Sequence, residues 1–153
     1  MTRKILAPLV LAMLSTPMLA AAEDYMNPVT DPVAQEECSA CHMAFPAGFL
    51  PARSWDRIMN TLDDHFGENA GLDDATRAAI GAYFVANAAD AGGRNPRLLR
   101  GVDPAATPLR ITELQWWTRE HNHEVSARQW DQAKSPANCA ACHRGAERGY
   151  FED

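Results

Sequence analysis

The stretches CSACH (Cys38–His42) and CAACH (Cys139–His143) contain all four cysteines of this 153-residue chain. Both follow the pattern C-x-x-C-H, which attaches haem covalently in c-type proteins. Two thiols separated by two residues can add to the vinyl groups on one edge of a haem, and the adjacent imidazole then reaches the iron. We therefore predict two covalent haem c groups, with His42 and His143 as axial iron ligands. The predicted attachment residues are Cys38, Cys41, Cys139 and Cys142.

Other uses of paired cysteines fit the sequence less well. A zinc site built from two C-x-x-C halves has about 15–20 residues between the halves, whereas 97 residues separate Cys41 from Cys139. Zinc also has no need of a histidine directly after each second cysteine. A thioredoxin-like redox pair requires β-α-β surroundings, and this Ala-rich, Val-poor sequence has almost no strand pattern. Haem attachment is the interpretation that explains both motifs.

Residues 1–22 have the pattern of a secretory signal peptide. Two basic residues precede an apolar run from Ile5 to Leu14, and small residues follow up to Ala22. The apolar run is too short to span a bilayer. We therefore expect cleavage after Ala22 and a soluble periplasmic protein without stable membrane insertion. An uncleaved membrane anchor is the alternative.

The expected mature chain is acidic. Removal of the signal peptide leaves 131 residues with 12 basic and 20 acidic side chains. A nucleic-acid-binding protein needs a stripe of basic residues to neutralise phosphates, and this composition does not supply one. We therefore expect no nucleic-acid partner.

Capping residues and hydrophobic periodicity predict several short helices. Ser54 and Asp73 are good N-caps, and Thr112 with Gln115 has the spacing of a capping box. Ser126 begins a further short helical segment. The expected helices cover residues 36–45, 55–66, 74–89, 112–121 and 126–133.

Residues 92–110 contain three glycines and three prolines, which favours a linker or a long loop. The arginines of this stretch are either solvated or paired with haem propionates, because guanidinium groups pair well with carboxylates. They are Arg94, Arg97, Arg100 and Arg110. The sequence thus predicts a mostly α fold of two small helical lobes, each holding one c-type haem. We predict an N-terminal haem lobe (23–92), a linker (93–107) and a C-terminal haem lobe (108–153).

The ligand opposite each motif histidine decides what the irons do. A methionine raises the reduction potential, a second histidine lowers it, and an open position lets small molecules bind. On the expected helix 55–66, His65 lies on the apolar face with Ile58 and Leu62. Met59 lies on a neighbouring line of the same helix. We predict that His65 is the second ligand of the first haem, with Met59 as the alternative.

The second haem has two candidate ligands, His121 and His123. In a helix that begins at Thr112, His121 aligns with Leu114 and Trp117 on the apolar face. His123 follows a more polar line and lies beyond the expected helix end. We predict that His121 is the ligand, with His123 as the alternative; otherwise His123 is a surface residue or one that supports a ligand.

With these residues placed, the sequence resembles the dihaem cytochrome c (DHC) family of bacterial periplasmic cytochromes. The resemblance implies a low-potential electron carrier with two bis-histidine haems. It also implies an N-terminal lobe similar to class I cytochrome c and a less regular C-terminal lobe. The family's distal histidines fall on His65 and His121. The resemblance covers nearly all of the mature chain and rests on CSACHMAFPAGFLP (38–51), HFGE (65–68), REH (119–121) and NCAACHRGAERGYF (138–151).

The resemblance also implies redox partners and no catalysis on a substrate. Members of that family are associated with a small monohaem cytochrome that binds oxygen and with membrane cytochromes b that supply electrons. Two alternatives stay open. One is an electron-transfer subunit of a periplasmic reductase such as nitrate reductase. The other is a gas-binding haem sensor or haem enzyme with one open iron. The chain is short for an enzyme of this kind, because a substrate cavity must fit beside two haems.

Overall fold

The computed structural model describes residues 25–93, 97–122 and 124–151. The predicted signal peptide, Arg94 and His123 lie outside the described residues. Within these ranges helices predominate, and strand-like pairing is limited to two isolated bridges, so the predicted mostly α fold is confirmed. No helix in the described ranges is long and apolar enough to cross a membrane. The α-helices are α1 (Pro32–Cys38), α2 (Ala52–Met59), α3 (Asp74–Ala86), α4 (Gln115–His121) and α5 (Ala127–Ala133).

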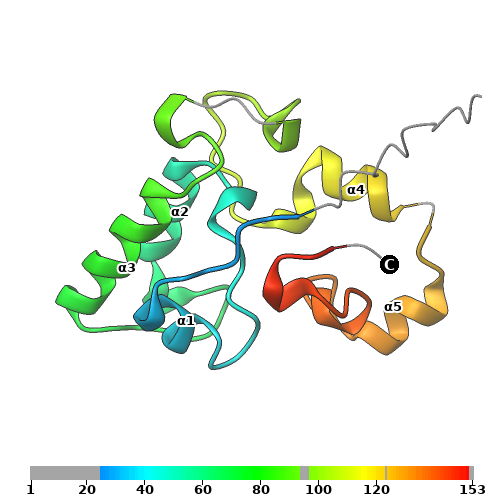
Figure 1. The fold of residues 1–153 in the computed structure, drawn as a ribbon, viewed down its shortest axis with the longest axis horizontal. Coiled ribbons are helices and arrows are strands. Elements are labelled where there is room, and N and C mark those ends of the chain that lie inside the picture. Colours follow the sequence, from blue (N-terminus) through cyan, green and yellow to red (C-terminus); the bar gives the residue numbers. More distant parts are fainter. Residues whose placement is uncertain (1–24, 94–96, 123, 152–153) are drawn as a thin grey trace, which may run out of the picture.

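Helices α1, α2 and α3 lie together on one side of the molecule, and α4 and α5 lie on the other (Figure 1). The main hydrophobic core forms where α2 packs against α3. Its centre is the stack of Trp55 on Phe84, whose ring centres are 4.4 Å apart. Ile80, on the same face of α3 as Phe84, is 1% exposed. Removing a buried ring of this kind costs about 3–5 kcal/mol, so this core contributes strongly to the stability of the fold.

Two of the predicted helix starts are confirmed. The carboxylate of Asp73 accepts hydrogen bonds from the backbone N–H groups of Ala75 and Thr76, at 3.0 and 3.1 Å, and α3 begins at the next residue. Ser126 forms a complete capping box with Gln129 at the start of α5. In each case a short polar side chain satisfies backbone donors that have no partner within the helix.

The prediction of a helix over residues 36–45 is wrong. The helix α1 begins earlier because Asp31 caps it, accepting from the N–H of Ala34 at 2.8 Å, and proline follows directly as the first helical residue. It ends at Cys38, so only the first cysteine of the motif is helical. The remainder of the motif, including His42, lies in a turn after α1.

The prediction of a helix over residues 55–66 is also wrong at both ends. The helix α2 starts after Pro51, whose carbonyl accepts from the N–H of Ser54 at 2.9 Å. It ends at Met59 because the next two side chains bond back to its last carbonyls. The Asn60 amide donates to the Asp56 carbonyl at 2.8 Å, and the Thr61 hydroxyl donates to the Arg57 carbonyl at 3.0 Å.

The capping box predicted at Thr112 does not form. Ile111–Glu113 is a separate 3-10 turn, closed by the N–H of Leu114 donating to the Ile111 carbonyl at 3.1 Å. Leu114 then occupies the N-cap position of α4 without a side-chain hydrogen bond. The helix nonetheless ends at His121, as the sequence predicts.

The two ends of the described chain meet at the junction between the helical groups. The Met26 N–H donates to the Gly149 carbonyl at 2.8 Å, and the ring centres of Tyr25 and Tyr150 are 5.0 Å apart. The N-terminal segment therefore packs against residues of the predicted C-terminal lobe. The boundaries of the two lobes stay a prediction.

Replacing Gly149 with alanine is expected to destabilise this junction. Gly149 has a φ of 87°, and an added Cβ would overlap the backbone carbonyl of Met26. The left-handed backbone alone costs a non-glycine residue about 1–2 kcal/mol, and the overlap adds to this. Gly92 is a matched control, since it has a φ of 66° but no atom within 4 Å of an added Cβ. Thermal unfolding should show a clearly larger loss for Gly149→Ala than for Gly92→Ala. Equal losses would contradict the described junction.

Candidate haem sites

The two histidines predicted for the first site lie opposite each other. The ring centres of His42 and His65 are 6.1 Å apart, and their planes differ by 26°. His42 Nδ1 lies 2.7 Å from the carbonyl of Met43, and its ring stacks on Phe45 at 4.8 Å. A hydrogen bond from Nδ1 to a carbonyl orients an imidazole and leaves Nε2 to bind a metal.

The position of His65 depends on a tight turn after α2. Its backbone exchanges two hydrogen bonds with Glu68, at 2.7 and 3.2 Å. The turn requires left-handed φ angles at Phe66 (58°) and Gly67 (99°). Burial lowers the pKa of His65, and the charges of His42 and Arg110 lower it further. The lowered pKa favours the neutral ring, which is the form that binds metals.

The C-terminal pair has the same separation but a different construction. The ring centres of His121 and His143 are 6.1 Å apart, and their planes are nearly perpendicular, at 79°. His121 is the last residue of α4. Its Nδ1 lies 2.8 Å from the Trp117 carbonyl, and its ring stacks on the Trp117 indole at 4.1 Å and 10°. Phe151 lies beside the His143 ring, with centres 5.7 Å apart.

The separation within each pair is the one that a shared metal ion requires. A metal–imidazole nitrogen bond is about 2 Å long, and the ring centre lies about 1 Å further out, so two rings on opposite sides of one ion have centres about 6 Å apart. Both pairs meet this value, at 6.1 Å. The residues present therefore fit an iron held between two histidines at each motif.

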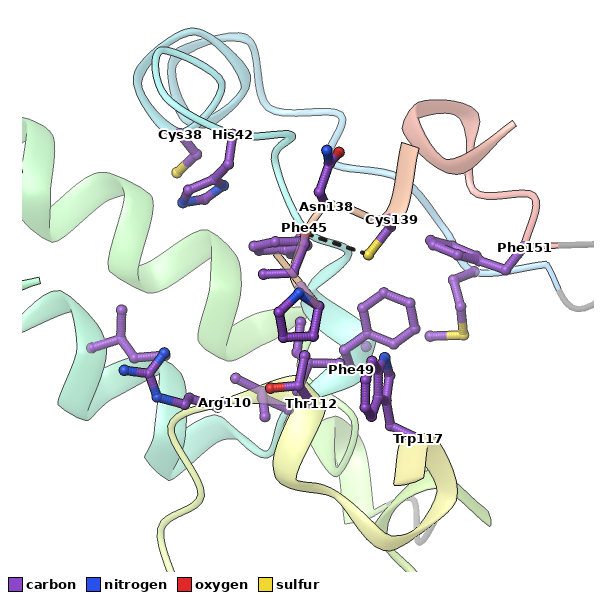
Figure 2. Close-up of a pocket in the computed structure, with 18 of the residues that line it drawn as sticks. Cys38, His42, Phe45, Phe49, Arg110, Thr112, Trp117, Asn138, Cys139 and Phe151 are labelled. Carbon is purple, nitrogen blue, oxygen red and sulfur yellow. Dashed lines mark hydrogen bonds between the residues drawn. The ribbon is translucent and has the colours of Figure 1, made fainter. Parts of the chain in front are cut away.

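One continuous cavity of about 2550 Å³ connects the two sites. This volume exceeds the roughly 300–1,000 Å³ that holds one small ligand, so the space fits more than one large group. Figure 2 shows Cys38 and His42 at one end and Cys139 at the other, with Phe45 and Phe49 between them. The wall is mostly apolar, as a macrocycle needs, and all four motif cysteines, both motif histidines, His65 and His121 line it.

Of the two alternative ligands, Met59 and His123, the structure describes only Met59. Met59 is 6% exposed in the core between α2 and α3. Its side chain lies 3.7 Å from the point that an added Cβ on Gly81 would occupy. It lines the cavity as well, but His65 is the residue that faces His42. His123 belongs to the undescribed positions.

No disulfide joins the four motif cysteines, so all four are available for attachment to haem. Burial raises the pKa of Cys38 to about 11, with a further contribution from the nearby Glu37. Burial likewise raises the pKa of Cys139.

Three of the four arginines considered as propionate partners line the cavity: Arg97, Arg100 and Arg110. The guanidinium of Arg110 lies 4.1 Å above the centre of the Phe66 ring and 3.6 Å from a Glu113 carboxylate oxygen. Phe66 directly follows His65, so this cation lies beside the first site.

Some residues that line the site lie outside the C-x-x-C-H motifs, so the motifs could not identify them. Phe45, Phe49 and Phe151 place aromatic rings along the cavity from distant parts of the sequence. The Phe49 ring lies 5.6 Å from Trp116 and 5.1 Å from Phe151, so it contacts two segments that are distant in the sequence. The sequence signal for these phenylalanine rings is their place in the quoted stretches around the two motifs, residues 38–51 and 138–151.

Comparisons with known proteins agree with this geometry. A family model described as dihaem cytochrome c matches residues 34–151. Among solved structures, a dihaem cytochrome c from Rhodobacter sphaeroides is 58% identical, with a TM-score of 0.79, over 82% of this chain and 99% of that one. A dihaem cytochrome c from Shewanella baltica OS155 is 35% identical, with a TM-score of 0.64, over 79% of this chain and 86% of that one. A search of curated proteins found no match.

The helical fold and the two motif sites define a c-type cytochrome with two haem groups. The chain belongs to the dihaem cytochrome c family. Its cofactors are accordingly two covalently bound haem c groups, and the resemblance found in the sequence is confirmed.

Proposed function

We propose that this cytochrome is a low-potential electron carrier in which both irons have two histidine ligands. His42 and His65 hold the first iron, and His143 and His121 hold the second. The observation that carries the proposal is the 6.1 Å separation of the ring centres in both pairs. The haem supplies the one-electron change at its iron, while the protein sets the potential and excludes other chemistry.

The surroundings of the histidines favour an electron carrier over a protein that binds a substrate at its iron. A hydrogen bond from Nδ1 to a backbone carbonyl increases the basicity of an imidazole and holds its ring in place. His42 and His121 both have a carbonyl oxygen within 2.8 Å of Nδ1. Two histidine ligands favour the ferric state, which lowers the potential relative to a His/Met pair. Six-coordinate irons also leave no position for a gas or peroxide.

We further propose a periplasmic location and redox protein partners. The N-terminal pattern of residues 1–22 supports export. The partners we propose are a small oxygen-binding monohaem cytochrome and a membrane cytochrome b that supplies electrons. The chain itself is then a soluble intermediate between them after signal cleavage. An electron-transfer role in a periplasmic reductase differs only in the partner.

Potentiometric titration of the holoprotein tests the proposed function. Two one-electron steps at low potential, in the range of bis-histidine haems and well below that of His/Met cytochromes c, are the expected result. Rapid mixing of the reduced protein with an oxidised monohaem c-type cytochrome should then show electron transfer between them. A high-potential step for either haem would contradict two bis-histidine irons.

A further inference from the structure

The indole nitrogen of Trp116 is a buried hydrogen-bond donor without a partner among the described residues. Burying an N–H group without an acceptor is unfavourable, and native structures rarely leave one unpaired. Trp55 shows the usual arrangement, since its indole nitrogen is also buried but donates to the Ala47 carbonyl at 2.7 Å. The unpaired state of Trp116 therefore points to an acceptor outside the polypeptide.

The haem cavity is the place where the structure offers room for an acceptor beside Trp116. Its side chain lines the cavity. On its other side the ring stacks on Phe49, with centres 5.6 Å apart and planes at 24°, and it packs against the hydrophobic core. This packing holds the ring in place at the wall of the cavity.

The chemistry of haem c limits what the acceptor can be. The macrocycle and its thioether links are apolar, and the iron is bound by histidine, so the strong acceptors of the group are its two propionate carboxylates. Cationic side chains line the same cavity, with Arg97, Arg100 and Arg110 among them. An environment with an oriented N–H donor and guanidinium groups suits a carboxylate.

We propose that Trp116 positions a haem propionate by donating a hydrogen bond from its indole nitrogen. Trp116 is then a positioning residue that partly neutralises the carboxylate and thereby raises the potential of the nearby iron. This inference rests on the two covalent haems and not on the identity of the sixth ligands. It can therefore fail while the bis-histidine proposal stands, and the bis-histidine proposal can fail while this inference stands.

Vibrational spectroscopy of the intact holoprotein tests the proposal directly. The ultraviolet resonance Raman difference between wild type and Trp116→Phe isolates the indole N–H band of Trp116, which should have the frequency of a hydrogen-bonded indole. Phenylalanine keeps an aromatic ring against Phe49 but has no donor. Haem labelled with ¹³C in its propionate carboxylates should show one carboxylate band that shifts in Trp116→Phe. The same variant should have one midpoint potential lowered at neutral pH and made more dependent on pH, because the carboxylate loses its donor.

Trp55→Phe is the matched control. It also removes a buried indole N–H, but that donor already has a backbone acceptor, so the propionate bands and both potentials should stay as in the wild type. A free indole N–H band for Trp116 would overturn the proposal. A hydrogen-bonded band with unchanged propionate bands would also overturn it, because the acceptor would then be water or another group. If Trp116→Phe folds poorly, Trp116→Leu gives the same two differences, because leucine also fills apolar space without a donor.

Discussion

Replacing His121 with alanine is expected to open one of the two haems to carbon monoxide. The ring of His121 lies opposite that of His143, and its removal leaves one iron with a single histidine ligand. A ferrous iron with an open position binds carbon monoxide, so the absorption spectrum of the reduced variant should shift for about half of the haem. The other haem should be unaffected, and added imidazole should restore the six-coordinate spectrum by filling the position of the lost side chain.

His123→Ala is the matched control, two positions further along the chain. It should leave both spectra as in the wild type, in the presence and absence of carbon monoxide. The reverse pattern, with His123→Ala opening a haem and His121→Ala leaving both closed, would show that His123 is the ligand. Failure of imidazole to restore the His121→Ala spectrum would indicate unfolding of α4 instead of loss of one ligand.

Replacing His65 with methionine is expected to raise one of the two midpoint potentials. A thioether stabilises ferrous iron relative to an imidazole, and axial ligands set haem potentials over a range of roughly 0.8 V. The shift should therefore be a readily measured fraction of that range. It should be confined mainly to the first haem, because His65 faces His42 and no residue of the second motif. Potentiometric titration of wild type and variant measures it.

Met59→Leu separates this effect from a change in packing. Met59 is buried in the core, and leucine has a similar volume and should cost less than about 1.5 kcal/mol in stability. Both potentials should be unchanged. A lowered or lost high-potential step in Met59→Leu, together with no effect of His65→Met, would assign the ligand role to Met59.

Local sequence signals predicted much of the secondary structure where a side chain caps a helix without help from tertiary contacts. Asp73 and Ser126 are examples, and both cap as expected. The signals failed where several residues competed. Ser54 is a residue type that favours the N-cap position, but Pro51 occupies the N-cap of α2 three residues earlier. Ser54 is therefore a fully buried residue inside the helix. At Thr112 the chain forms a 3-10 turn in place of the capping box.

The candidate sites were predictable for a different reason. The covalent chemistry of haem fixes the spacing of cysteines and histidine in each motif, so both motifs could be recognised without any knowledge of the fold. The choice of His65 relied on a helix that in fact ends at Met59. The structure brings His65 opposite His42 through the turn at Phe66 and Gly67, whose left-handed angles no periodicity argument includes.

The aromatic residues that line the cavity lay beyond such reasoning. Phe49 touches both Trp116 and Phe151, which are 67 and 102 positions away in the sequence. Contacts of this kind depend on how distant segments pack together, and a single sequence holds no local pattern for them. The same is true of the unpaired indole of Trp116, which is recognised only from its burial.

The central claim is that both irons are held by two histidines and have no open position. The most direct test is the absorption spectrum of the fully reduced holoprotein at neutral pH, recorded before and after saturation with carbon monoxide. The account predicts that the two spectra are the same. A carbon monoxide spectrum at either haem of the wild-type protein would contradict it.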